Sequence, residues 1–182
     1  MRVVLSLICV FALIACQQEP VESGNSAENQ AGHQAPRGRV IKYGLYEVIR
    51  TGRLVDNAGT STGKSHSAST LQFIRQTNRV PLKIGNYFGF QSRIEPLPDR
   101  HFIKLKKVVT HPEMTLPAGS KKTGYQVDET KKVSIGVAFT TSGYSLDEDY
   151  ELVEGEWTIQ YWFEDRMLVE QKFYTYWPEN HL

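Results

Sequence analysis

The sequence predicts an all-β fold, an antiparallel β-sandwich, and three observations favour it. Short runs rich in β-branched and aromatic residues follow one another from residue 40 onward, with turn residues between them. No segment of this region shows the periodicity of an amphipathic helix. The 182 residues, 40% of them hydrophobic, can build one core but are too few for two full domains.

The expected strands follow from apolar runs and from alternation with period two, which is typical of a strand buried on one face. The run 80–94 is expected to bend at Gly85 or Gly89. A short turn at 164–166 returns the chain, so the last two strands predict a hairpin. In chain order, the expected strands are 40–49, 71–74, 80–94, 102–109, 133–139, 157–163 and 167–176.

Two stretches between these strands are predicted to be loops. Residues 52–68 are rich in Gly, Ser and Thr, and residues 111–130 contain Pro112, Pro117, Gly119 and Gly124. Glycine and proline break regular structure for different reasons, one through its freedom and the other through its fixed φ angle.

The first fifteen residues have the features of an export signal. Arg2 supplies a positive charge, and Val3 to Ile14 form an apolar run too short to span a bilayer. The run ends in Leu13-Ile14-Ala15-Cys16, which resembles the lipobox of bacterial lipoproteins. We therefore expect residues 1–15 to be cleaved and Cys16 to carry a lipid anchor. The alternative is a plain secretory signal with an incidental cysteine.

Two further expectations concern location. By resemblance to enterobacterial lipoproteins, Gln17 in place of aspartate favours the outer membrane, with the protein facing the periplasm. Residues 16–39 are rich in polar and small residues and bury too little apolar area to fold, so they predict a flexible, disordered tether. The sandwich domain is then expected over 40–182. Because Cys9 lies in the signal, no disulfide is expected.

A set of short motifs in the predicted domain resembles the bacterial family called domain of unknown function 3859. The resemblance covers most of residues 43–177. It implies an immunoglobulin-like sandwich and no established activity, and the long 52–68 loop is more elaborate than the family leads us to expect. The motifs are Tyr43-Gly44-Leu45-Tyr46, Val80-Pro81, Phe88-Gly89-Phe90, Thr110-His111-Pro112, Gly143-Tyr144-Ser145, Glu151-Leu152-Val153, Gly155-Glu156-Trp157-Thr158 and a hairpin ending at Phe173.

Nucleotide and nucleic-acid binding are both disfavoured. Residues 58–65 (AGTSTGKS) match a relaxed phosphate-binding loop, but no buried strand precedes them and no helix follows. The formal net charge is only +1, whereas nucleic-acid binding needs a surplus of basic residues. We therefore expect this protein to bind neither a nucleotide nor a nucleic acid, and to have no cofactor.

The titratable residues do not predict a catalytic or metal site. His66, His101, His111 and His181 lack the close spacing of zinc ligands, and no Gly-x-Ser-x-Gly elbow supports a serine nucleophile. His111 is expected to have a hydrogen-bonded structural role. The acidic stretch 147–156 lacks the order of a calcium loop, and a solvated loop is expected there.

Aromatic residues on both faces of the predicted C-terminal hairpin are the best candidate site. Trp162 lies on the opposite face from Trp157 and Tyr161, and Tyr174 and Tyr176 lie opposite Phe173. One face must be core, so the other is either covered by the long loops or available to a partner. Interfaces favour Tyr and Trp.

These observations predict a non-enzymatic envelope lipoprotein that binds another component of the envelope, expected to be a protein. Trp162, Tyr174 and Tyr176 are the candidate contact residues, with Lys64 and His66 of the 52–68 loop. An alternative is an inhibitor or immunity protein that blocks a cell-wall hydrolase or toxin, with that loop as the plug.

Overall fold

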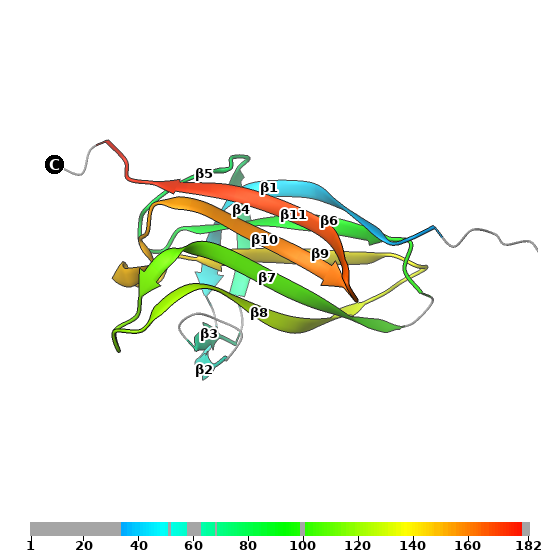
Figure 1. Ribbon diagram of the computed structural model, residues 1–182. Helices are drawn as coiled ribbons and strands as arrows, with labels where there is room; N and C mark the ends of the chain where they lie inside the picture. The colour runs from blue at the N-terminus through cyan, green and yellow to red at the C-terminus, as the bar shows by residue number, and fades with distance from the viewer. Residues whose placement is uncertain (1–33, 51, 58–62, 68, 99–100, 180–182) are drawn as a thin grey trace, which may run out of the picture. The chain divides into compact units, whose positions relative to one another are not determined.

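The computed structural model describes residues 34–179 apart from 51, 58–62, 68 and 99–100. Within this range two β-sheets form a sandwich (Figure 1), so the predicted all-β fold is confirmed. The elements are β1 (Arg37–Arg50), β2 (Leu54–Asp56), β3 (Lys64–His66), β4 (Ser69–Arg75), β5 (Arg79–Pro81), β6 (Tyr87–Glu95), β7 (Phe102–Thr115), β8 (Lys121–Lys132), β9 (Ala138–Ser145), the 3₁₀ turn η1 (Asp149–Glu151), β10 (Gly155–Phe163) and β11 (Arg166–Tyr176).

One sheet has the strand order β4-β1-β6-β9 and the other has the order β5-β11-β10-β7-β8, while β2 and β3 pair only with each other. All pairings are antiparallel except that of β5 with β11. The predicted antiparallel sandwich therefore carries one short parallel strand at an edge.

Large aromatic side chains fill the space between the sheets. Phe88 of β6 lies edge-to-face against Trp157 of β10 and against Phe173 of β11, with ring centroids 5.3 and 5.0 Å apart. All three side chains are fully buried. Burying a side chain of this size contributes roughly 2–3 kcal/mol, so this contact is a main source of attraction between the two sheets.

The predicted C-terminal hairpin is confirmed. Trp157 pairs with Phe173 across β10 and β11, and the register continues to Phe163 opposite Arg166 with one irregularity between Tyr161 and Trp162. Trp157 and Tyr161 are buried between the sheets. The alternation of a strand then places Trp162 on the outer face.

The prediction of one bent strand over residues 80–94 is wrong. This run forms β5 and β6, which belong to different sheets. The break comes at Gly85, whose φ of 88° is in the left-handed region that glycine adopts without strain. Asn86 donates a side-chain hydrogen bond to the Pro81 carbonyl (2.8 Å) and stabilises the turn.

The strand predicted at 133–139 is wrong, because most of that segment is a tight turn. Ser134 and Val137 bridge across it, and Ile135 and Gly136 have φ angles of 52° and 67°. Ile135 is 94% exposed. Strand β9 begins only at Ala138, so its inward residues are one position out of phase with the expected pattern and Phe139 points outward.

The two predicted loops also contain strands. Strand β7 continues through His111 and Pro112 to Thr115, and Lys121–Lys132 form β8. Strand β8 was missed because it lies at a sheet edge, where exposed charged side chains replace the expected apolar alternation. Within 52–68, β2 and β3 make a short hairpin.

Three glycines from the family motifs lie in one row across the four-stranded sheet. Gly44 of β1 pairs with Gly89 of β6, which pairs with Gly143 of β9. A Cβ atom on Gly143 would lie 2.3 Å from the Phe88 carbonyl oxygen and 2.5 Å from the Tyr87 ring. The ring of Tyr87 therefore lies against Gly143 at the edge of the sheet, a contact that any larger residue at 143 would prevent.

Candidate functional site

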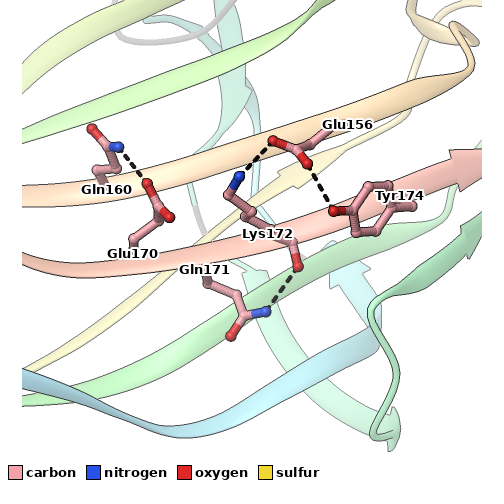
Figure 2. A network of polar contacts seen from close by, with 6 residues as sticks. All are labelled: Glu156, Gln160, Glu170, Gln171, Lys172 and Tyr174. Carbon is pink, nitrogen blue, oxygen red and sulfur yellow. Dashed lines mark hydrogen bonds and ion pairs between the residues drawn. The ribbon is translucent and has the colours of Figure 1, made fainter.

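The outer surface of the β10–β11 hairpin carries an ordered polar network. We call it the hairpin face and define it by Glu156, Gln160, Trp162, Glu170, Lys172, Tyr174 and Tyr176. The Tyr174 hydroxyl donates to Glu156 Oε2 (2.7 Å), and Lys172 Nζ donates to Glu156 Oε1 (2.8 Å) (Figure 2). One carboxylate thus orients a tyrosine and a lysine from the neighbouring strand.

The network continues along both strands. Gln160 Nε2 donates to Glu170 Oε2 (2.6 Å), as Figure 2 shows, and Gln160 Oε1 accepts from Trp162 Nε1 (2.9 Å). The indole is therefore fixed by the amide two residues before it. The hairpin face presents side chains in set positions, which lowers the entropy lost when they contact a partner.

Hydrogen bonding also sets the charges of this network. The bonds from Lys172 and Tyr174 lower the pKa of Glu156. The same carboxylate raises the pKa of Lys172 and of Tyr174. The ionic forms of Glu156 and Lys172 are thus reinforced, while the Tyr174 hydroxyl keeps its proton.

The aromatic residues at the end of the hairpin differ in their exposure to solvent. Tyr174 is 41% exposed and Trp177, just after β11, is 45% exposed. The rings of Trp162 and Tyr176 are half-buried, and each has a cation over it: Lys106 Nζ lies 5.5 Å from the Trp162 centroid and Arg79 Cζ lies 4.9 Å from the Tyr176 centroid. Tyr174 is therefore the most open of the three predicted contact residues.

The other predicted site residues are not part of this face. Lys64 and His66 lie in β3, on the separate two-stranded sheet opposite Asp56 and Leu54. The side chain of His66 and all of Cys16 lie outside the described residues.

A shallow depression continues the hairpin face toward β7 and β8. It encloses about 410 Å³ and is lined by Phe102, Ile103, Lys104, Lys106, Asp128, Phe163 and Glu164. Its lining combines apolar side chains with charged side chains of both signs, and it is open rather than enclosed. It therefore suits a single side chain of a partner better than a buried small molecule.

The sequence did not predict a second polar cluster, which lies between the sheets where β8 and β9 diverge. We call it the gap cluster and define it by Lys107, Glu129, Lys131 and Tyr161. The Tyr161 hydroxyl and Lys131 Nζ both donate to Glu129 Oε2, each over 2.7 Å. Lys107 reaches across from β7, and its Nζ donates to the carbonyl oxygen of Gly143 in β9 over 3.4 Å.

Burial dominates the electrostatics of the gap cluster. Burial lowers the pKa of Lys107 and raises that of Tyr161. Burial also opposes ionisation of Glu129, but the hydrogen bonds from Lys131 and Tyr161 and the charge of Lys107 outweigh it, so the pKa of Glu129 is lowered. The carboxylate therefore compensates the positive charges placed between the sheets.

The prediction of a solvated acidic loop over residues 147–156 is wrong for Glu151. Glu151 is 1% exposed and accepts hydrogen bonds from the Tyr144 hydroxyl (2.6 Å) and from the backbone N–H groups of Asp147 (2.6 Å) and Glu148 (2.9 Å). Burial raises its pKa. This side chain holds the 3₁₀ turn that leads into β10.

His111 has the structural role that the sequence predicted. It is buried against Trp157, with ring centroids 5.0 Å apart, and its Nδ1 lies 2.7 Å from the Pro112 carbonyl oxygen. Burial lowers its pKa and favours the neutral ring.

The described ranges of the chain contain neither a cluster of metal-ligating side chains nor a membrane-spanning helix. The structure there places no three His, Cys, Asp or Glu side chains where they could hold one metal ion. In the same part of the chain, no helix has the length and apolar character needed to cross a membrane.

The two packed sheets and the aromatic core define an immunoglobulin-like β-sandwich. The fold is similar to the crystal structure of an immunoglobulin-like protein from Pseudomonas aeruginosa, with a TM-score of 0.53 and 22% identity over 80% of this chain and 99% of the other. At this identity the likeness supports the fold alone. No curated protein matches the chain significantly.

Residues 34–175 match the family described as Domain of unknown function (DUF3859), and the chain belongs to this family. The motif resemblance seen in the sequence is thereby confirmed. Several of these motifs meet in the structure, since their glycines form the row in the four-stranded sheet and His111 packs on Trp157.

Proposed function

We propose that this chain is a lipid-anchored envelope protein that binds another envelope protein without catalysing a reaction, and that the hairpin face makes the contact. The observation that carries the proposal is Tyr174, an aromatic residue 41% exposed on a sheet surface and oriented by Glu156. Exposed tyrosines with few rotatable bonds are frequent energetic centres of interfaces.

The charges of the hairpin face favour a protein partner. Acidic Glu156 and Glu170 alternate with basic Lys172, and Lys106 lies beside Trp162. A surface of mixed sign is complementary to another protein surface, whereas a nucleic acid would select a basic one. The adjacent depression offers room for a protruding side chain.

The proposed location in the cell rests on the sequence alone. The motif Leu13-Ile14-Ala15-Cys16 favours lipidation of Cys16, and Gln17 favours the outer membrane. A polar segment between Cys16 and β1 would then allow the domain to reach partners in the periplasm.

Site-specific photo-crosslinking tests the proposed contact. The full chain would be produced in its source bacterium with benzoylphenylalanine in place of Tyr174, and in a control with the same residue in place of Tyr150, which lies in η1. We expect one envelope protein to be conjugated from position 174 and not from position 150. Equal conjugation from both positions, or none from 174, would contradict the proposal.

Substitutions then test which residues contribute to affinity. Trp162→Ala and Tyr174→Ala should each abolish capture of that protein while the circular dichroism spectrum stays that of the wild type. Tyr150→Ala serves as the matched control and should leave capture unchanged. Undiminished capture by both test variants would exclude the hairpin face.

An inhibitor or immunity protein remains the alternative, and one observation favours it. In the β2–β3 hairpin, Leu54 is 58% exposed and Val55 is 41% exposed, so apolar side chains project from a small element that pairs only with itself. Deleting residues 55–67 discriminates the two functions. Loss of all partner binding with an intact fold would favour the hairpin as a plug, and retained binding would favour the hairpin face.

A further inference from the structure

Strand β9 differs from the other edge strands that the structure describes. Its eight residues, Ala138–Ser145, include no charged side chain. By contrast, β4 contains Arg75, β5 contains Arg79, and β8 carries Lys or acidic residues at half of its positions. Charged residues on edge strands normally prevent the addition of another strand, so β9 lacks a protection that the other edges have.

Hydrogen bonding indicates which backbone groups of β9 point away from β6. The Gly143 carbonyl oxygen accepts the hydrogen bond from Lys107 Nζ and so faces the gap between β8 and β9. In an antiparallel strand the N–H and C=O of one residue point to the same side, and alternate residues share that side. The N–H and C=O groups of Phe139 and Thr141 therefore face outward too.

Two of the residues whose backbone groups face outward are also exposed. Phe139 is 65% exposed and Thr141 is exposed as well. The chain turns at Ile135 and Gly136, between β8 and β9, and the two consecutive strands belong to different sheets. An added strand would continue the four-stranded sheet next to β9.

The charges beside the edge select the kind of strand that fits. Lys107 is a buried lysine whose hydrogen bond, 3.4 Å long, goes to a neutral carbonyl. The nearby Glu129 already accepts hydrogen bonds from Tyr161 and Lys131. An added strand would take over the Gly143 carbonyl with its own N–H, and a carboxylate on that strand would give Lys107 a better partner.

We propose that the β9 edge binds an extended acidic polypeptide segment by β-strand addition, with an Asp or Glu side chain of that segment beside Lys107. Main-chain hydrogen bonds to Phe139, Thr141 and Gly143 would supply the affinity. Lys107 would make the site selective for acidic segments. This site is separate from the hairpin face, and the proposal does not depend on the function proposed for that face.

A second copy of the chain is a poorer occupant for electrostatic reasons. Two-fold pairing of β9 with itself would bring two Lys107 side chains together. It would also bring together two β8 strands, in each of which four lysines (Lys121, Lys122, Lys131 and Lys132) outnumber two acidic residues (Asp128 and Glu129). Like charges placed close together weaken such an interface.

The probe is a phage library of random twelve-residue peptides, panned on the immobilised full chain. We expect enriched peptides to combine β-branched residues with at least one Asp or Glu and to lack proline in their centre. One enriched peptide would then be synthesised with a fluorophore, and its Kd would be measured by anisotropy.

Three variants locate the bound peptide. Phe139→Glu adds an edge charge that repels an acidic strand, and Thr141→Pro removes an N–H that does not pair with β6. Each should weaken binding of the peptide by about tenfold or more, the effect of losing one or two hydrogen bonds. Lys107→Met should weaken acidic peptides but not their amide (Asn or Gln) versions. Ile74→Glu is the control, since Ile74 is a similarly exposed position (59%) on β4, the other edge strand of the same sheet.

Several outcomes would overturn the proposal. These are the absence of enriched peptides, unchanged Kd values in Phe139→Glu and Thr141→Pro, and an equal loss of affinity in Ile74→Glu. A concentration-dependent dimer of the wild type that Phe139→Glu abolishes would assign the edge to a second copy instead. Because Phe139 is exposed, its substitution is expected to leave the thermal unfolding temperature close to that of the wild type.

Discussion

The same combination of residue types, a glutamate that accepts hydrogen bonds from a tyrosine and a lysine, occurs twice in this protein. One such triad lies on the hairpin face and the other in the gap cluster. On the surface, Glu156 accepts hydrogen bonds from Tyr174 and Lys172. Between the sheets, Glu129 accepts hydrogen bonds from Tyr161 and Lys131. The distances are nearly equal, but the side chains of Glu156 and Lys172 are 40% and 46% exposed, whereas those of Glu129 and Lys131 are 26% and 22% exposed.

The comparison shows that surroundings, rather than residue types, decide what such a triad does. In water, an ion pair contributes little to stability, and its main effect is to fix the positions of its members. Between the sheets, the same contacts compensate charges that have lost hydration, and removing one member leaves the others uncompensated. One triad thus orients a surface, while the other links β8 to β10.

The largest expected effect is a loss of stability from a substitution in β9, the strand beside the gap cluster, that leaves the triad of Glu129, Lys131 and Tyr161 unchanged. Gly143→Ala would place a Cβ 2.3 Å from the Phe88 carbonyl oxygen and 2.5 Å from the Tyr87 ring. We expect this variant to lose about 3 kcal/mol of unfolding free energy, measured by urea denaturation. Thr141→Ala, on the same strand but exposed, should change it by less than about 0.5 kcal/mol. Equal stability of the two variants would show that β9 can move away from β6.

The next effect tests the two carboxylates directly. Glu129→Ala leaves Lys131 and Tyr161 without their shared acceptor and Lys107 without a nearby negative charge. It should cost about 2 kcal/mol. Glu156→Ala, its surface counterpart, should not measurably change the urea midpoint. If both variants lost the same stability, burial would not be the difference between the triads.

The hydroxyl groups provide a smaller version of the same test. Tyr161→Phe removes the hydrogen bond to Glu129 and should cost about 1 kcal/mol, whereas Tyr174→Phe should leave the unfolding temperature unchanged. In a partner-binding assay we expect the reverse order, with a loss only in Tyr174→Phe. A stable Tyr161→Phe variant would indicate that Lys131 alone satisfies Glu129.

The smallest effect is a dependence on pH. Because the pKa of Glu129 is lowered in the folded protein, its stabilising contribution is present above the ordinary carboxyl pKa and is lost as the pH falls through the lower folded value. The stability difference between the wild type and Glu129→Gln should therefore be full at pH 7 and shrink below about pH 4. A difference that grew on acidification would contradict the assignment.

Alternation was the part of the sequence that predicted structure best. Trp157, Ile159 and Tyr161 alternate with polar residues, and the structure buries all three in β10. The same alternation placed Trp162 on the outer face. The pattern succeeds there because β10 lies in the middle of its sheet, with one face on the core and one on solvent.

The same reasoning failed where local geometry or an edge intervened. Val133, Ile135 and Val137 also alternate, yet left-handed φ angles at Ile135 and Gly136 make that segment a turn. Strand β8 was missed because Tyr125 and Val127 are its only hydrophobic residues, while most of its other residues are charged or polar. A signal was present in the spacing of Tyr125 and Val127, but it was too short to outweigh the surrounding charges.

The sequence by itself determined the fold class, the C-terminal hairpin and the face on which Trp162 and Tyr174 lie, because these depend on local alternation and on turn residues. Only the tertiary structure decided that Glu129 and Lys107 meet between the sheets, that Glu151 is buried and that β9 forms an edge without charge. Strands β7 and β8 are neighbours, but β9 lies in the other sheet. Contacts between sheets depend on how the whole chain packs, and residues distant in sequence carry no local pattern that records them.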